Sequence, residues 1–162
     1  EVFEKADEKA GNSLLYSMVM GNYTFGSRIT GINDMPINDK LFILQSDIIK
    51  SAADKGPCVI IGRCGDYILR EYDNVFRVFI HANKEARIKR ILSKGLCDEK
   101  KVSDFITKRD KQRANYYNFY SNKRWDDLSN YHLTIDSSEF DIDEVAEIII
   151  TAIGKIKPPA KK

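Results

Sequence analysis

The chain has 162 residues, 43% of them hydrophobic and 31% charged, which is typical of one folded globular domain and excludes a disordered or fibrous protein. Its 26 basic and 24 acidic residues leave a net charge of +2, so the overall charge gives no argument for a nucleic-acid or membrane partner. No apolar run approaches the roughly 20 residues that span a bilayer, and no signal segment opens the chain.

The first part of the chain predicts two helices joined by a loop. Residues 1–20 carry Glu and Lys and then apolar residues at helical spacing, whereas residues 22–38 mix glycine, asparagine and proline without periodicity. Asp39 can cap the second helix, which ends before Gly56.

Three short apolar runs predict parallel strands that are buried on both faces, at residues 58–62, 76–80 and 131–135. Helical stretches at residues 84–94 and 99–120 separate the second run from the third. Such alternation of strands and helices predicts a three-layer α/β/α fold, in which helices cover both faces of a parallel sheet.

A last helix is predicted from Asp141, which forms a capping-box pattern with Glu144. We expect a single domain over residues 1–157 and a flexible tail at residues 158–162.

The three cysteines form no CxxC pair and are odd in number, which argues against a disulfide framework and against a zinc cluster. We therefore expect reduced thiols and a cytoplasmic protein. The two histidines, His81 and His132, stand alone in or beside predicted strands, and we interpret both as structural. No metal-binding pattern is present, and no metal site is predicted.

Ligands of open parallel sheets bind beyond the carboxyl ends of the strands, here at residues 62–66, 81–83 and 136–138. The sequence GRCGD at 62–66 places Arg63 between two glycines, where a backbone can approach a phosphate closely. The alternative is that Arg63 pairs with Asp66 or with a helix-end carbonyl and only stabilises the loop. Its position at a strand end favours a binding role.

Two pairs of arginines lie on the helices that follow the second strand. Arg109 and Arg113 are four residues apart and share one helix face, as do Arg87 and Arg90, three apart on the preceding helix. Together these arginines could bind a polyphosphate. Phosphoryl transfer depends on positioning the phosphates and on offsetting the charge of the phosphoryl group that moves. The alternative for each one alone is an ordinary solvated side chain.

Aromatic residues follow these arginines directly. They could stack on a base, but packing is the preferred interpretation, because a tyrosine keeps a buried ring and a wet hydroxyl without any ligand. They are Tyr116, Tyr117, Phe119 and Tyr120.

The stretches GPCVIIGRCGDYIL at 56–69, VFRVFIHA at 75–82, EARIKR at 85–90, KRDKQRANYY at 108–117 and NYHLTIDSS at 130–138 match the cytidylate kinase-like family in order and spacing. The chain resembles this family over roughly residues 39–150. The resemblance implies the fold of P-loop nucleoside monophosphate kinases, with a helical lid over about residues 84–120. It also implies ATP with Mg²⁺ as phosphoryl donor and CMP or dCMP as acceptor.

The resemblance also suggests roles for single residues. Arg63, together with Asp66 and Arg90, is expected to bind the acceptor nucleotide, and Arg87 is expected to bind ATP. The arginine pair on the returning lid helix is expected to reach the phosphates between donor and acceptor and to act in catalysis. That pair is Arg109 and Arg113.

The chain departs from the family at one essential place, because no GxxxxGK[ST] phosphate loop occurs in the 162 residues and the strand that would precede it is also missing. We expect residues to be missing upstream of Glu1, and a full-length parent to carry the activity. The alternatives are a non-catalytic nucleotide-sensing module on the same fold, or a nucleic-acid-binding domain, which the near-neutral charge disfavours.

Overall fold

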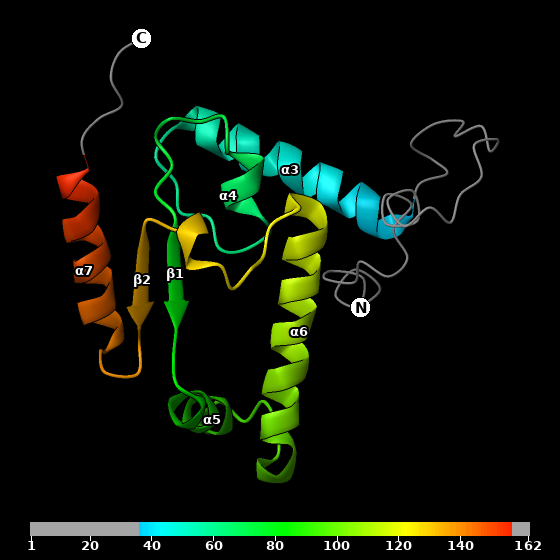
Figure 1. Cartoon of the computed structure of the whole chain (residues 1–162), viewed down its shortest axis with the longest axis vertical. Helices are drawn as coiled ribbons and strands as arrows, with labels where there is room; N and C mark the ends of the chain where they lie inside the picture. Colours follow the sequence, from blue (N-terminus) through cyan, green and yellow to red (C-terminus); the bar gives the residue numbers. More distant parts are fainter. Residues whose placement is uncertain (1–35, 157–162) are drawn as a thin grey trace. The chain divides into compact units, whose positions relative to one another are not determined.

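The computed structural model describes residues 36–156, so the predicted helix at 1–20 and most of the predicted loop at 22–38 lie outside the described residues. Figure 1 shows the described elements. In chain order they are α3 (Ile37–Lys55), α4 (Gly65–Ile68), β1 (Val78–His81), α5 (Lys84–Ser93), η2 (Glu99–Lys101), α6 (Val102–Ser121), η3 (Leu128–Asn130), β2 (Leu133–Asp136) and α7 (Ile142–Lys155). None of these helices is both long enough and apolar enough to cross a bilayer.

The chain divides into two compact units. Of the described residues, unit 1 contains 36–69 and 111–125, and unit 2 contains 70–110 and 126–156. Helix α6 contributes its first part to unit 2 and its second part to unit 1. The expectation of a single domain stays a prediction.

The sheet of unit 2 has two parallel strands, with Val78 opposite Leu133 and His81 opposite Asp136 (Figure 1). Both strands were expected from the sequence, and each begins two residues later than predicted. Just before the strands, the Arg77 carbonyl accepts from His132 N over 2.8 Å, and Arg77 N donates to His132 Nδ1 over 3.2 Å. The parallel pairing of the two runs is confirmed.

The prediction of a strand at residues 58–62 is wrong, because this segment is not a strand. A strand exists through hydrogen bonds to a neighbouring strand, and among residues 36–156 only β1 and β2 are paired in a sheet. Val59 and Ile61 are 91% and 88% exposed, so the apolar run is not buried either. The described part of the chain is a mixed α/β structure, mostly helical, with a small parallel sheet.

Aromatic rings form the core of unit 1. Buried Tyr116, Tyr117 and Tyr120 on α6 pack with buried Cys64, and Phe42 of α3 stacks on Tyr120 with ring centroids 3.9 Å apart. Each tyrosine hydroxyl donates a hydrogen bond to a polar side chain of another segment of the unit. The tyrosines after the arginine pair are therefore packing residues here, in agreement with the preferred interpretation of the sequence.

The first described helix differs from the prediction at its start. Helix α3 begins at Ile37 after the N-cap residue Pro36, so Asp39 lies inside its first turn and is not the N-cap. Asp39 is instead fully buried and accepts a hydrogen bond from Tyr120, a partner 81 residues away that local sequence cannot reveal.

The other helices follow the sequence closely. Helix α5 and the pair η2 and α6 occupy the two predicted helical stretches. At the start of α7, the Asp141 carboxylate accepts from Glu144 N and the Glu144 carboxylate accepts from Asp141 N, so the predicted capping box is confirmed.

Candidate functional site

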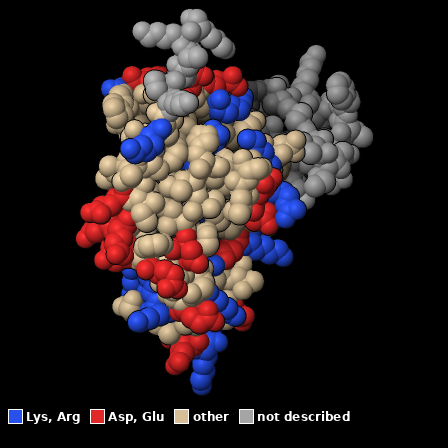
Figure 2. All heavy atoms as spheres, turned by 60° about the vertical axis from the view of Figure 1, so that its left-hand side comes forward, with Lys and Arg blue, Asp and Glu red and all other residues tan. Residues whose placement is uncertain are grey.

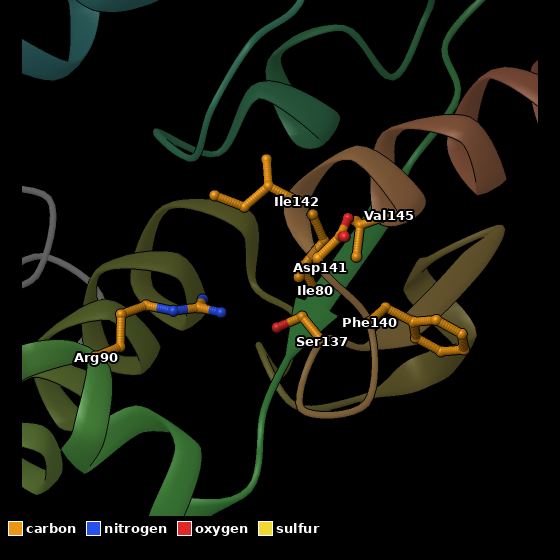
Figure 3. Close-up of a pocket in the computed structure, with 7 residues that line it drawn as sticks. All are labelled: Ile80, Arg90, Ser137, Phe140, Asp141, Ile142 and Val145. Atoms are coloured by element: carbon orange, nitrogen blue, oxygen red, sulfur yellow. The ribbon is translucent and has the colours of Figure 1, made fainter.

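Unit 2 has a pocket at the carboxyl ends of its two strands, where ligands of parallel sheets usually bind. The cavity has a volume of about 180 Å³ and is open to solvent. One side chain comes from β1, one from α5, and the others from the β2–α7 connection and the first turn of α7 (Figure 3). They are Ile80, Arg90, Ser137, Phe140, Asp141, Ile142 and Val145.

The turn after β2, residues 137–138, forms the floor of the pocket through Ser137 and is held in place by hydrogen bonds. Ser137 is buried, and both its backbone N–H and its hydroxyl donate to the carbonyl of His81, over 2.7 and 2.9 Å. The next residue, Ser138, donates from its hydroxyl and its N–H to Asp136 Oδ1. These hydrogen bonds lower the pKa of Asp136 below its usual value, so its carboxylate is charged at neutral pH.

The opposite wall is apolar and comes mainly from the start of α7. Val145 is buried, whereas Ile142 is 81% exposed and stands at the rim. Asp141 also lines the pocket, but one of its oxygens accepts the capping hydrogen bond from Glu144 N. The pocket therefore combines an apolar wall with a few polar groups, which is the usual composition of a small-molecule site.

Arg90 brings a positive charge to this pocket from α5. Its guanidinium group points toward the Ser137 hydroxyl (Figure 3). A guanidinium group is planar and stacks on aromatic faces as well as binding anions. Opposite an apolar wall, such a group suits a flat aromatic ring that carries hydrogen-bonding atoms at its edge.

The two other arginines of unit 2 that the sequence singled out are engaged with protein groups. Arg87 forms an ion pair with Asp110 through two hydrogen bonds of 2.7 Å, and the bond to Asp110 raises the pKa of Arg87 further above its usual value. Arg109 is exposed and lies over the ring of Phe105, 5.4 Å from its centroid.

The remaining three predicted site residues belong to unit 1. Arg63 and Cys64 have positive φ angles of 55° and 54°, which is unusual for residues with a side chain and often marks functional loops. Asp66 accepts a hydrogen bond of 2.6 Å from Tyr117, and Arg113 is exposed on α6. The convergence of these residues with the arginines of unit 2 on one ligand stays a prediction.

The neighbouring thiol does not contribute a nucleophile. Burial, and then the nearby charge of Asp66, raise the pKa of the Cys64 thiol to about 12, so it is protonated at neutral pH. Within residues 36–156, no group of three His, Cys, Asp or Glu side chains could hold a metal ion.

Sequence reasoning found part of the pocket and missed the rest. Arg90 was singled out, and residues 136–138 were marked by their position after a strand. Phe140, Ile142 and Val145 were not, because apolar residues at the start of an amphipathic helix give no signal that separates a pocket wall from a core face.

Comparison with known proteins places the chain in a family. Residues 1–139 match the model of the cytidylate kinase-like family, and the chain belongs to that family. Two relatives are named cytidylate kinase. The protein of Methanosarcina barkeri is 31% identical over 106 residues, and that of Methanoculleus marisnigri is 26% identical over 122 residues.

These alignments cover 62% and 75% of the chain, which spans 57% and 65% of the length of the two relatives. Among solved structures, an uncharacterized protein from Eubacterium ventriosum is similar, with a TM-score of 0.69 and 31% identity. That match covers 74% of this chain and 76% of the other.

Proposed function

We propose that the full-length protein transfers a phosphoryl group from ATP to a nucleoside monophosphate, with CMP or dCMP as the first candidates. Membership of the cytidylate kinase-like family and the names of the two archaeal relatives support this reaction. The observation that carries the proposal in the structure is the pocket at the carboxyl ends of β1 and β2, with Arg90 at its mouth.

The size and lining of the pocket suit the base of a nucleotide. An apolar cavity of about 150 Å³ is known to accept benzene, so 180 Å³ is enough for a single heteroaromatic ring and too small for a whole nucleotide. Arg90 would stack on or bond to the ring, Phe140 and Ile142 would supply apolar contact, and the sugar and phosphates would lie outside the pocket.

The proposal includes the three-layer fold and the lid as well as the reaction. In this proposal, Arg63 and Asp66 bind the acceptor nucleotide, and Arg109 with Arg113 binds the phosphates. Arginine suits that role because its fork of N–H donors matches phosphate oxygens.

Magnesium fits the proposal as a partner of the nucleotide. The described residues offer no cluster of carboxylates that would hold the ion alone, and Mg²⁺ is often held by one or two carboxylates together with substrate phosphates. When bound with ATP, it offsets negative charge on the phosphates that are being separated.

The test is ATP consumption by the full-length protein with Mg²⁺, measured in parallel with CMP, dCMP, UMP, AMP and GMP. We expect turnover with CMP or dCMP and a large loss in Arg90→Ala. Arg70→Ala is the matched control, because Arg70 pairs with Glu71 on the surface of the same unit and does not line the pocket. Turnover that is equal in both variants would remove Arg90 from the site.

The second candidate is a nucleotide-sensing module without catalysis. It is favoured by the lack of a GxxxxGK[ST] pattern in the 162 residues. Binding of CMP or ATP to the full-length protein without turnover of any of the five acceptors would support it over the kinase.

A nucleic-acid-binding role has less support. Figure 2 shows one face of the molecule, on which Lys and Arg side chains alternate with Asp and Glu around an uncharged area. A nucleic-acid surface normally concentrates basic residues, and binding that weakens steeply with salt would be its signature.

A further inference from the structure

The position of Arg90 depends on helix α5, which packs only loosely against the rest of unit 2. Helix α5 has ten residues, and none of them is buried. A helix this short is marginal by itself, and a buried apolar face usually fixes such a helix in place. In α5 the apolar residues Ile88, Ile91 and Leu92 are only half-buried, so polar contacts contribute to where Arg90 points.

The first of these contacts fixes the start of α5. The Asn83 side chain caps the helix by accepting from Ala86 N over 2.8 Å, and Asn83 N donates to the Ser138 hydroxyl over 2.7 Å. Ser138 is bonded in turn to Asp136 at the end of β2. The beginning of α5 is thereby tied to the turn that forms the floor of the pocket.

One tied end still leaves a helix able to pivot and to rotate about its axis. Arg87 supplies the second contact, since two of its guanidinium nitrogens each lie 2.7 Å from a different oxygen of Asp110 on α6. A two-bond pair of this kind fixes direction as well as distance. It lies partly shielded from solvent, with the two side chains 31% and 30% exposed.

Arg87 and Arg90 are linked by the geometry of the helix. Residues three apart differ by about 60° around the axis of an α-helix, so the two side chains leave α5 in neighbouring directions. Any rotation of α5 that moves Arg87 away from Asp110 also carries Arg90 out of its present place in the lining of the pocket.

We infer that Arg87 is a positioning residue, whose ion pair with Asp110 holds α5 in the rotation that places Arg90 in the pocket. This inference rests on the proposed function, because the pocket is taken as the nucleotide site. It assigns Arg87 a different role from direct contact with ATP, which the family resemblance implied. Lysine could not replace Arg87 fully, because an ammonium group cannot form the paired bonds of a guanidinium group.

The first test is binding of CMP that carries a fluorescent group on its ribose, measured on the full-length protein. We expect Arg90→Ala to weaken binding roughly 3- to 30-fold, the range of a cation–π contact. Arg87→Ala and Asp110→Ala should each weaken it several-fold, and Arg87→Lys should recover only part of the loss. In an Arg90→Ala background, Arg87→Ala should cause no further loss, because Arg87 acts through Arg90.

Two results of this test would overturn the inference while leaving the proposed function intact. One is unchanged binding in Arg87→Ala when Arg90→Ala weakens it. The other is a further loss when Arg87→Ala is added to Arg90→Ala, which would indicate that Arg87 contacts the nucleotide directly.

A second measurement does not depend on the nucleotide. Without ligand, hydrogen exchange of the backbone amides of α5 should speed up in Arg87→Ala and in Asp110→Ala, and should stay unchanged in the control Arg70→Ala. Unchanged exchange in the first two variants would overturn the inference even if the protein binds no nucleotide. Faster exchange together with an absence of nucleotide binding would support the role of the ion pair in holding α5 and would contradict the proposed function instead.

Discussion

Tyr120 donates a hydrogen bond of 3.0 Å to Asp39, a residue without exposed surface. The bond joins α6 to the first turn of α3 within unit 1, and the stacking of Phe42 on Tyr120 adds an apolar contact between the same two helices. A buried carboxylate needs donors to replace water, so this hydroxyl contributes more to stability than a surface hydrogen bond does.

We therefore predict that Tyr120→Phe lowers the free energy of unfolding by about 1–3 kcal/mol, the usual cost of removing a donor from a buried polar group. The matched control is Tyr116→Phe, which removes a longer bond of 3.2 Å to the neutral amide of Gln45. It should cost less, about 0.5–1.5 kcal/mol. Urea unfolding of the two variants measures the difference, and an equal or larger effect in Tyr116→Phe would contradict the prediction.

The pair Arg77 and His132 predicts a loss of stability in weak acid. Burial of the ring, and then the charge of Arg77, lower the pKa of His132 below its ordinary value of 6.5. The unfolded chain therefore binds the proton more readily than the folded protein. The stability due to neutral His132 is complete above about pH 6.5 and is lost as the pH falls through the lower pKa of the folded state.

The measurement is the free energy of unfolding of the natural protein and of His132→Gln, at several pH values from 8 to 5. Glutamine keeps hydrogen-bonding capacity and does not titrate. We expect the natural protein to lose more stability than the variant over this range. Parallel curves would show that His132 has the same pKa in the folded and unfolded states.

The cysteines are expected to react in an order set by burial and pKa. Cys58 is exposed, Cys97 is half-buried and Cys64 is buried, with a thiol whose pKa is raised to about 12. At pH 8, iodoacetamide should label Cys58 first and Cys64 only after the protein is unfolded in urea, because the thiolate is the reacting form. Peptide mass spectrometry identifies the labelled residue, and fast native labelling of Cys64 would contradict its buried position.

Gly65 at the start of α4 has no space for a side chain. A Cβ atom there would lie 2.8 Å from Ile60 Cγ2, and this β-branched side chain has little freedom to move aside. Gly65→Ala should lower the free energy of unfolding by about 1–3 kcal/mol, as overpacking does.

Two further variants make that experiment specific. Adding Ile60→Ala to Gly65→Ala should cause less loss than the sum of the two single changes, since it removes the clash. Gly154→Ala in α7 is the control, because no atom lies within 4 Å of its added Cβ. It should be neutral or stabilising by up to about 1 kcal/mol.

The features that the sequence predicted well are those that depend on neighbours in the chain. The capping box of Asp141 and Glu144, the extent of α5 and the end of α3 before Gly56 all follow from residues within one or two turns of each other. Local interactions of this kind need no knowledge of the rest of the molecule.

Features that depend on distant partners were mispredicted or missed. Asp39 looked like a helix cap and is a buried acceptor for Tyr120, while residues 58–62 looked like a buried strand and have no paired strand within residues 36–156. Nothing in the sequence around Arg87 indicated that its guanidinium group would bind Asp110, which lies 23 residues later. For Asp39 and Arg87, the deciding partner lies far along the chain.

The sequence alone predicted α3, α5, α6 and α7, the two strands that pair, the family resemblance and the importance of strand ends as binding positions. Only the tertiary structure decided which side chains meet there, and so brought Arg90 to a pocket with Ile80 and Ser137. The physical reason is that helix propensity and capping act over a few residues, whereas a pocket requires segments that are distant in the chain to be placed together by packing and hydrogen bonds.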